Sequence, residues 1–303
     1  MPADPTSAGA LVAQCAARLG IADAELVRVG QCVAFSGELH GGKVLVRVLQ
    51  PGADYRKECA VAVRAKQIGV QLPAIIAGPL ELDGSLFENR HVWVWEFVES
   101  GTSKLDHRLV GQQVALLHTL PAGFAPVRDP LAHRLRVLFD RLRMLEVTNR
   151  IAPPVASRLV EAGMAASVLI TKSRSEMILN GVCHGDLKPS NVLVTDSGPV
   201  LVDWDSCFFG DLFWDLGCWW DAVTTCAPTT AAGLLAGAEF LCGYNQASGL
   251  NVGPAALQGW AQLKSLSVLT YLLVRTGETV TREADKRLLH WTHSAPNVGW
   301  TDL

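Results

Sequence analysis

Hydrophobic positions repeat with two different periods along the chain, and each period predicts one kind of element. After a possible helix cap at residues 5–7, apolar residues recur at helical spacing, which predicts a helix that ends at Gly20. Over residues 25–49 apolar and polar positions alternate, which predicts short antiparallel strands. We expect a further helix over residues 54–68 and two more strands over residues 80–98.

The pattern becomes mostly helical after a polar interruption at residues 99–102. Helical periodicity returns in four ranges, which are 105–120, 131–145, 153–170 and 214–293. Only residues 181–205 read as strand-turn-strand. This order predicts an α+β protein in which a small antiparallel-sheet lobe, residues 1–98, precedes a larger helical lobe, residues 99–303.

Composition narrows the class of protein without identifying it. The chain has 303 residues, of which 49% are hydrophobic and 18% charged, and this excludes a disordered polyelectrolyte. The net charge of −3 disfavours a nucleic-acid partner, because phosphate contacts need clustered positive charge. Neither a signal peptide nor a membrane span is apparent, so we expect no membrane partner and a cytoplasmic protein. The eight cysteines have no metal-binding spacing and are expected to be reduced and buried.

One segment carries most of the chemical information. Residues 184–191 read HGDLKPSN, and Asp203 follows Asn191 by twelve positions, after a predicted hairpin. The hairpin returns the chain beside its own start, so we expect Asp186, Asn191 and Asp203 to lie close together. Two carboxylates and an amide oxygen are hard ligands of the kind that Mg²⁺ prefers and zinc does not.

This segment resembles the catalytic loop of the aminoglycoside phosphotransferase family, the antibiotic and choline kinase relatives of the protein kinases. The resemblance implies a two-lobed, protein-kinase-like fold. It implies that Asp186 is the catalytic base, that Lys188 approaches the transferred phosphate, and that Asn191 and Asp203 bind Mg²⁺. It also implies that His184 supports the loop.

The same resemblance assigns residues to the nucleotide. Arg47 matches the basic residue that binds phosphate, and Glu58 is its expected ion-pair partner. Residues 30–37 lie where the family has its phosphate loop, so Ser36 is a candidate phosphate contact, although a plain hairpin fits equally well. Glu96, Phe97 and Val98 lie in the segment that presents backbone groups to the nucleobase in the family; they do not distinguish ATP from GTP.

The resemblance says less about the acceptor. Asp215 matches the aspartate that braces the catalytic loop, and Asp205 and Asp211 are candidate substrate contacts. The region after residue 210 also carries several cations, which weakens an aminoglycoside acceptor specifically. Four tryptophans are expected either to pack in the core or to form a stacking wall, namely Trp214, Trp219, Trp220 and Trp260.

The function that these features imply is Mg²⁺-dependent transfer of a nucleotide γ-phosphate to a hydroxyl of a small molecule. An antibiotic or amino-sugar-type acceptor is favoured, only because such enzymes are numerous in the family. A choline-, homoserine- or sugar-type metabolite is the first alternative, and a catalytically silent nucleotide-binding module is the second. A protein substrate is disfavoured because no activation segment fits between residues 203 and 220. The pattern leaves monomer and homodimer open.

Overall fold

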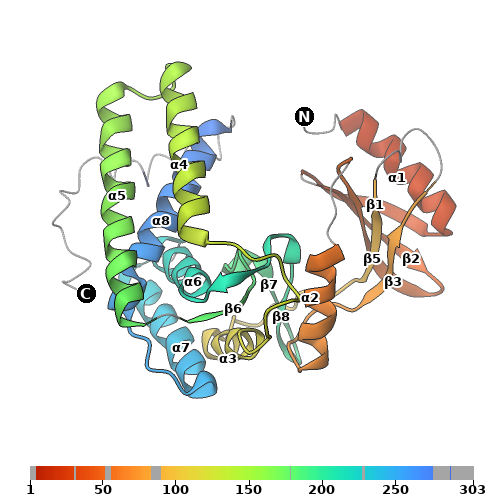
Figure 1. Cartoon of the computed structure of the whole chain (residues 1–303). Helices are drawn as coiled ribbons and strands as arrows, with labels where there is room; N and C mark the ends of the chain where they lie inside the picture. Colours follow the sequence, from red (N-terminus) through yellow and green to blue (C-terminus); the bar gives the residue numbers. More distant parts are fainter. Residues whose placement is uncertain are drawn as a thin grey trace. The chain divides into compact units, whose positions relative to one another are not determined.

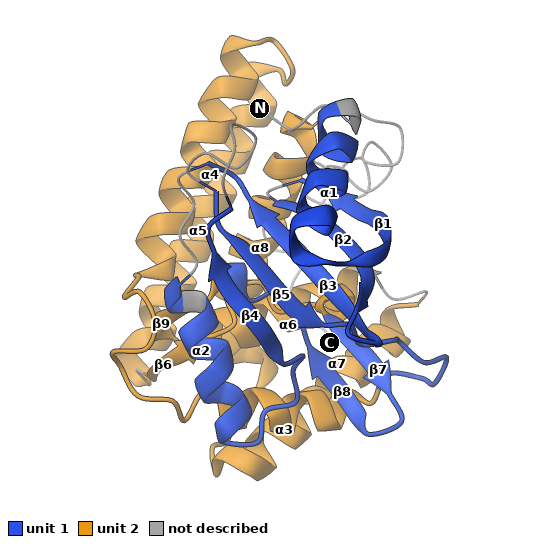
Figure 2. Ribbon diagram, turned by 90° about the vertical axis from the view of Figure 1, so that its right-hand side faces the viewer, with its two compact units in different colours: residues 1–105, 192–205 blue, residues 106–191, 206–303 orange. Residues whose placement is uncertain are grey.

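The computed structural model describes residues 5–30, 32–51, 56–82, 90–177, 179–226, 229–275 and 287. The chain divides into two compact units (Figure 2). Unit 1 comprises residues 1–105 and 192–205, and unit 2 comprises residues 106–191 and 206–303. The hairpin at 192–205 therefore belongs to the same unit as the N-terminal sheet. The lobe boundary between residues 98 and 99 is a different division of the chain, and it stays a prediction.

Unit 1 is built on a five-stranded antiparallel sheet with the strand order β1-β2-β3-β5-β4 (Figure 1). Its elements in this part of the chain are α1 (Pro5–Leu19), β1 (Ala22–Val29), β2 (Cys32–Leu39), β3 (Gly42–Leu49), α2 (Arg56–Gln67), β4 (Ile75–Leu80) and β5 (Val92–Glu96). The hairpin adds β7 (Val192–Thr195), β8 (Gly198–Leu201) and the short 3₁₀ turn η3 (Trp204–Ser206), which crosses the unit boundary.

The core of unit 1 lies between α1 and one face of the sheet. Leu11 and Cys15 of α1 are buried there against Val44, Val46 and Val48, which alternate along β3 and are each at most 1% exposed. This arrangement confirms both the helix and the period-two strands that the pattern predicts.

One predicted strand is wrongly placed. The strand expected to begin near Leu80 instead ends there, because β4 occupies Ile75–Leu80. Gly78 and Pro79 lie inside it, and both residue types ordinarily signal a turn. β4 is an edge strand with an irregular register against β5, which is where a sheet tolerates proline. Residues 83–89, in the expected turn, lie outside the described residues.

Unit 2 is mainly helical. Its elements are α3 (His107–Leu117), α4 (Pro130–Val147), α5 (Pro153–Glu176), β6 (Asn180–Cys183), the 3₁₀ turn η2 (Pro189–Asn191), β9 (Phe208–Asp211), α6 (Phe213–Cys226), α7 (Thr230–Ser248) and α8 (Pro254–Val274). Aspartates 106 and 129 cap α3 and α4, and Thr229 caps α7. The small antiparallel pair β6 and β9 carries the loop that follows β6.

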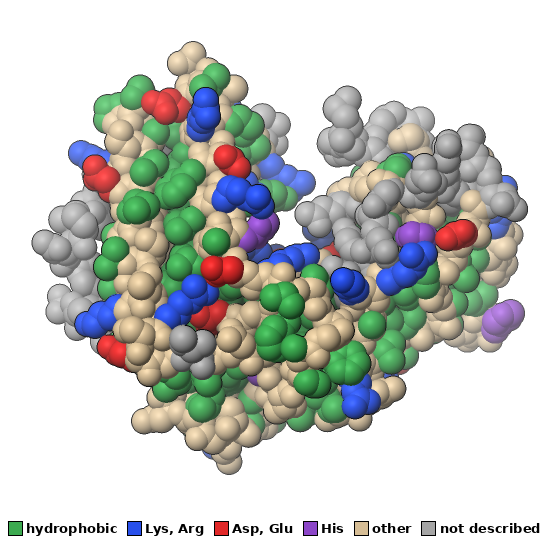
Figure 3. Space-filling model, in the orientation of Figure 1, with side chains coloured by type: hydrophobic (Ala, Val, Ile, Leu, Met, Phe, Trp, Pro, Cys, Tyr) green, Lys and Arg blue, Asp and Glu red, His purple; other side chains and the backbone are tan. Residues whose placement is uncertain are grey.

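Helix α8 packs against α4, α5 and α6 and so forms the centre of unit 2 (Figure 1). The core contains Trp214, Trp219 and Trp260, each fully buried, and Trp220 is 5% exposed. Core packing is therefore the correct interpretation of these tryptophans. On the outside, hydrophobic side chains are visible along α4 and α5 in Figure 3, the helices that carry the exposed Val147 and Val168.

Two further sequence expectations can be compared with the described residues. No helix among them is long and apolar enough to cross a membrane. Seven cysteines are described, and all seven are free thiols. Six of these are buried as expected, but Cys242, on α7, is exposed. The side chain of Cys226 is outside the described residues.

Candidate active site

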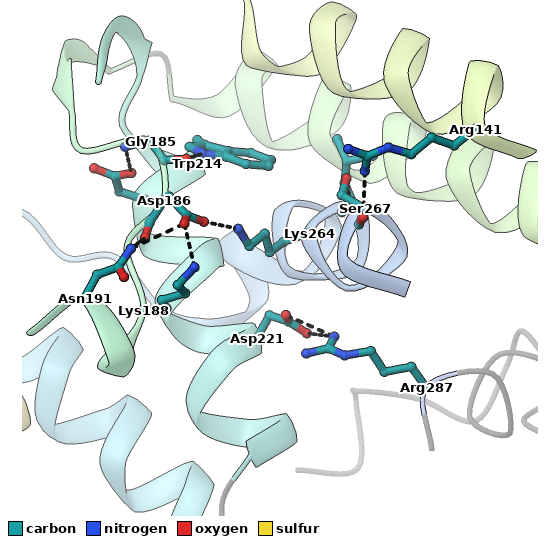
Figure 4. Close-up of polar contacts among 12 residues, drawn as sticks. Arg141, Gly185, Asp186, Lys188, Asn191, Trp214, Asp221, Lys264, Ser267 and Arg287 are labelled. Atoms are coloured by element: carbon teal, nitrogen blue, oxygen red, sulfur yellow. Dashed lines mark hydrogen bonds and ion pairs between the residues drawn. The ribbon is translucent and has the colours of Figure 1, made fainter. Parts of the chain in front are cut away.

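The loop between β6 and β7 brings three of the predicted site residues together. The Asp186 carboxylate accepts hydrogen bonds from Lys188 Nζ at 2.6 Å and from Asn191 Nδ2 at 3.3 Å. Asn191 Nδ2 also donates to the Asp186 backbone carbonyl at 2.9 Å, because η2 turns the chain back at this point. Asp186, Lys188 and Asn191 therefore form one cluster within unit 2 (Figure 4).

A fourth residue of this cluster comes from a distant helix. Lys264 of α8 donates from Nζ to the second Asp186 oxygen at 2.8 Å (Figure 4). Lys264 is only 8% exposed, so its charge is held in place by the surrounding core. Sequence reasoning missed this contact because 78 residues separate the pair and no local spacing signals it.

The charges around Asp186 keep it ionised. Burial by itself raises the pKa of this carboxyl group, but the ammonium groups of Lys264 and Lys188 lower it by more. The net result is a pKa below the usual range for aspartate. Asp186 is thus an anion with two fixed cationic partners, and it can accept a hydrogen bond or a proton from a bound hydroxyl group.

Asp215 of α6 holds the start of the loop in place. Its fully buried carboxylate accepts the backbone N–H groups of His184 at 2.6 Å and Gly185 at 2.9 Å. His118 Nε2 lies 3.3 Å from the same carboxylate, and His118 Nδ1 lies 3.0 Å from the hydroxyl oxygen of Tyr244. Asp215, His118 and Tyr244 therefore form a buried hydrogen-bond network that holds the backbone of His184 and Gly185. The supporting roles of Asp215 and His184 stay predictions.

Gly185 permits a close approach that a side chain would block. Its φ of +85° lies in the left-handed region, and a Cβ atom placed there would be 2.0 Å from the Ser206 backbone oxygen. The Gly185 carbonyl accepts a hydrogen bond from Trp214 Nε1 at 2.9 Å. Glycine at position 185 is thus required by the local backbone packing.

A second group of predicted residues lies in unit 1. Arg47, on β3, forms ion pairs with Asp205 and with Asp203, the latter at 3.4 Å. Arg28 of β1 lies 3.8 Å from the other Asp203 oxygen. Burial lowers the pKa of the Arg47 guanidinium, but the nearby carboxylates, first of all Asp205, raise it by more, so Arg47 remains charged.

The described carboxylates beside Arg47 are Asp205 and Asp203. The predicted pairing of Arg47 with Glu58 stays a prediction. Glu58 lies on α2, and its side chain is outside the described residues. Asp205, a predicted substrate contact, is 13% exposed and is engaged by Arg47.

The remaining nucleotide candidates make local contacts, and their role toward the nucleotide stays a prediction. Ser36 lies within β2, which pairs with β1, and it is 8% exposed. Its contact with phosphate stays a prediction. The Glu96 carboxylate accepts the backbone N–H of Ala74 at 2.9 Å. The backbone N–H of Phe97 donates to the Lys43 carbonyl at 3.2 Å, while Val98 follows just after β5.

Asp211, the other predicted substrate contact, is engaged within its own unit. Its carboxylate accepts Arg174 Nε at 2.8 Å and the Phe213 backbone N–H at 2.9 Å, and the residue is 3% exposed. Burial raises the pKa of Asp211, and Arg174 partly opposes this shift. These contacts are typical of a residue that fixes the junction of β9 and α6.

The donor atoms at Asn191 and Asp203 suit a divalent cation. Because Asn191 Nδ2 is used by Asp186, its amide oxygen remains as a ligand atom. The Asp203 side chain is 29% exposed, and its carboxylate is a second oxygen donor. A hard cation such as Mg²⁺ prefers oxygen donors of this kind. Asn191 lies in unit 2 and Asp203 in unit 1, and each is described within its own unit.

Comparison with known proteins identifies the family. The model of the phosphotransferase enzyme family matches residues 33–264. No curated protein sequence matches the chain at a significant level.

Solved structures with the same fold include three kinases. An amicoumacin kinase in complex with AMP-PNP, Ca²⁺ and Ami is 11% identical, with a TM-score of 0.68, covering 93% of this chain and 92% of that one. A microcompartment-associated aminopropanol kinase is 18% identical, with a TM-score of 0.67 and coverage of 93% and 96%. Choline kinase from Cryptosporidium parvum Iowa II is 14% identical, with a TM-score of 0.67 and coverage of 94% of each chain.

These similarities confirm the predicted α+β, protein-kinase-like fold. The family match extends over most of the chain and includes both the loop at 184–191 and Lys264. The chain belongs to the phosphotransferase enzyme family, and it is a kinase-type phosphotransferase with an alcohol group as acceptor.

Proposed function

We propose that this enzyme transfers the γ-phosphate of ATP or GTP to a hydroxyl group of a small metabolite or antibiotic, with Mg²⁺ as the metal. The observation that carries the proposal is the position of the Asp186 carboxylate. Lys188, Lys264 and Asn191 donate hydrogen bonds to it, and Asp215 accepts hydrogen bonds from the backbone of the same loop. Phosphoryl transfer needs little covalent chemistry from the protein and depends on positioning and on charge stabilisation. A preorganised anion with cationic neighbours meets both requirements.

Each residue of the site has a distinct role in this proposal. Asp186 orients the acceptor hydroxyl group and takes its proton as the oxygen attacks the γ-phosphorus. Lys188 stabilises the negative charge of the transferred phosphoryl group, and Arg47 binds phosphate oxygens of the nucleotide. Asn191 and Asp203 would hold Mg²⁺, which when bound neutralises charge on the nucleotide phosphates. A related structure that contains AMP-PNP and Ca²⁺ supports a nucleotide and a divalent cation in this fold.

The acceptor is a small molecule with a free hydroxyl group. Related kinases are named for amicoumacin, aminopropanol and choline, so the fold accommodates both antibiotics and small metabolites. An antibiotic or amino-sugar-type acceptor and a choline-, homoserine- or sugar-type acceptor are therefore the two groups to compare. We place the reaction in the cytoplasm, where nucleoside triphosphates are supplied.

Nucleotide binding and turnover test the proposal separately. The thermal stability of the protein is measured with MgATP, MgGTP and no nucleotide, and phosphate transfer is then measured against a panel of hydroxylated compounds. We expect a nucleotide to raise the melting temperature and at least one acceptor to be phosphorylated. Nucleotide binding without transfer to any acceptor or to water would instead indicate a catalytically silent module.

The metal assignment predicts a specific effect of Asp203→Asn. Asparagine tolerates the left-handed conformation of Asp203, where φ is +68°, and it keeps the side-chain shape. We expect the affinity for nucleotide in the presence of Mg²⁺ to fall about tenfold or more, about 1.4 kcal/mol, because a charged metal ligand is lost. The measurement is a nucleotide titration with and without Mg²⁺.

Asp196→Asn is the matched control for this prediction. Asp196 is exposed at the turn between β7 and β8, so the variant removes the same charge from the same hairpin without touching the proposed metal ligand. We expect Asp196→Asn to bind nucleotide as the unaltered protein does. Normal Mg²⁺-dependent binding by Asp203→Asn would show that the metal assignment is wrong.

A further inference from the structure

The surroundings of Asp186 contain more positive charge than the carboxylate neutralises. Lys264 and Lys188 each contact one of its oxygens, at 2.8 and 2.6 Å. A third cation, Arg134 of α4, lies close enough for its charge to interact with Asp186 and with Lys264. In the proposed reaction the transferred phosphate balances the positive charge of Lys188, and Asp186 balances that of Lys264. The positive charge of Arg134 is then left without a balancing anion.

The Trp214 ring lies close to both Arg134 and Lys264. The Arg134 guanidinium carbon lies 4.6 Å from the centre of the Trp214 ring, and Lys264 Nζ lies 5.7 Å from it. The indole N–H of Trp214 donates to the backbone of the loop that carries Asp186. Arg134, Lys264 and the loop that carries Asp186 therefore all contact one fully buried side chain.

Among the described residues, Arg134 forms no ion pair or hydrogen bond, and its guanidinium group lies over the Trp214 ring. The guanidinium group is half-buried, and burial lowers its pKa. Asp221, another buried acid of unit 2, is already paired through both oxygens with Arg287 at 3.2 Å (Figure 4). A half-buried guanidinium with unused donors, beside a catalytic carboxylate, is suited to bind an oxyanion.

The rest of α4 reinforces the positive charge. Arg141 lies two turns beyond Arg134 on the same helix and donates to the Ser267 carbonyl of α8 at 3.1 Å (Figure 4). The pKa of His133 is lowered, first by burial and then by Arg134, Arg136 and Arg128, as expected of a group in a positive field. Binding a polycationic acceptor here would place like charges together, which costs free energy.

We propose that Arg134, next to Lys264 and Asp186, forms an oxyanion subsite and that the physiological acceptor is an alcohol that also carries a carboxylate or phosphate group. This inference rests on the proposed function, since it assigns the acceptor side of the same site. It favours an acidic acceptor over the amino-sugar type. Arg134 selects the acceptor, Lys264 positions Asp186, and Asp186 receives the hydroxyl group.

Four compounds of similar size test the charge of the acceptor: gluconate, glucose 6-phosphate, glucose and glucosamine. Each is titrated into the protein with MgATP, and the rate of nucleotide consumption is measured. An acceptor accelerates this rate, and an unproductive ligand inhibits the background hydrolysis. We expect gluconate or glucose 6-phosphate to change the rate of nucleotide consumption at concentrations at least about tenfold lower than those that glucosamine requires. The two acids distinguish a carboxylate from a phosphate subsite.

Variants of Arg134 connect this preference to one side chain. Arg134→Gln should reduce the preference for the acid about tenfold or more, and Arg134→Lys should restore part of it because the charge returns. Arg136→Gln is the matched control, since Arg136 is an exposed arginine on the same helix. The concentration at which glucose changes the rate of nucleotide consumption should be the same in the unaltered protein and in all three variants, because glucose carries no charge.

The outcomes separate this inference from the proposed function. Loss of the background hydrolysis in Asp186→Asn shows that the kinase site is active, whatever the acceptor is. With that activity present, the inference is wrong if glucosamine acts at an equal or lower concentration than both acids, if no compound acts, or if Arg134→Gln keeps the full preference. If neither nucleotide binding nor hydrolysis is detected, the proposed function itself fails.

Discussion

Asp186→Ala is expected to reduce turnover at least about 100-fold, about 2.7 kcal/mol of activation free energy, with little loss of nucleotide affinity. The reason is geometric. The carboxylate is the anion at the centre of the cluster, and Lys188, Asn191 and Lys264 all donate to it. Without it, the acceptor hydroxyl group loses both its orientation and its proton acceptor. Steady-state phosphate transfer, together with a nucleotide titration, gives the two quantities.

A second variant at the same position separates chemistry from folding. Alanine leaves the buried Lys264 without its carboxylate, which destabilises the protein for a reason unrelated to catalysis. Asp186→Asn keeps the shape and a hydrogen-bond acceptor, and its turnover should be reduced to a similar extent. Asp140→Asn, at an exposed position of α4, is the matched control. Normal turnover in Asp186→Asn would exclude Asp186 as the catalytic base.

Asp215→Ala is expected to lower the free energy of unfolding by about 3 kcal/mol and to abolish most activity. The fully buried carboxylate accepts two backbone N–H groups of the catalytic loop and lies beside His118. Its removal leaves both donors buried without acceptors, and the loop that carries Asp186 loses its support. Urea denaturation measures the loss of stability.

Asp106→Ala gives a scale for that loss. Asp106 also accepts a backbone N–H group, that of Leu109, but it does so at the exposed N-terminus of α3. Water can replace this acceptor, so we expect a cost of only about 1 kcal/mol. If Asp215→Ala is no more destabilising than Asp106→Ala, the buried network does not support the loop in the way that we infer.

Residues in one short segment were predictable because their arrangement is local. The loop at 184–191 places Asp186, Lys188 and Asn191 together through a single turn of chain, so residue types and spacing were sufficient. The strand β3 and the helices could be predicted for the same reason. Each element buries one of its faces, so its apolar residues repeat at the period of that element. The phosphotransferase function followed from that segment, and the family match now supports it.

Tertiary packing decided everything that involves distant parts of the chain. β4 contains Gly78 and Pro79 and is a strand only because an edge position in the sheet accepts them. Arg47 pairs with carboxylates more than 150 residues away in the chain, and only the packing of unit 1 brings these groups together.

The positive charge around Asp186 also depends on tertiary packing. The sequence determined that this chain carries a kinase-type catalytic loop, because that loop folds through contacts between near neighbours. It did not determine that Lys264 and Arg134 are beside it, because helices α4 and α8 bring those charges there only when unit 2 packs. Side chains from separate helices set the electrostatic environment of Asp186, and their proximity is a product of the folded core.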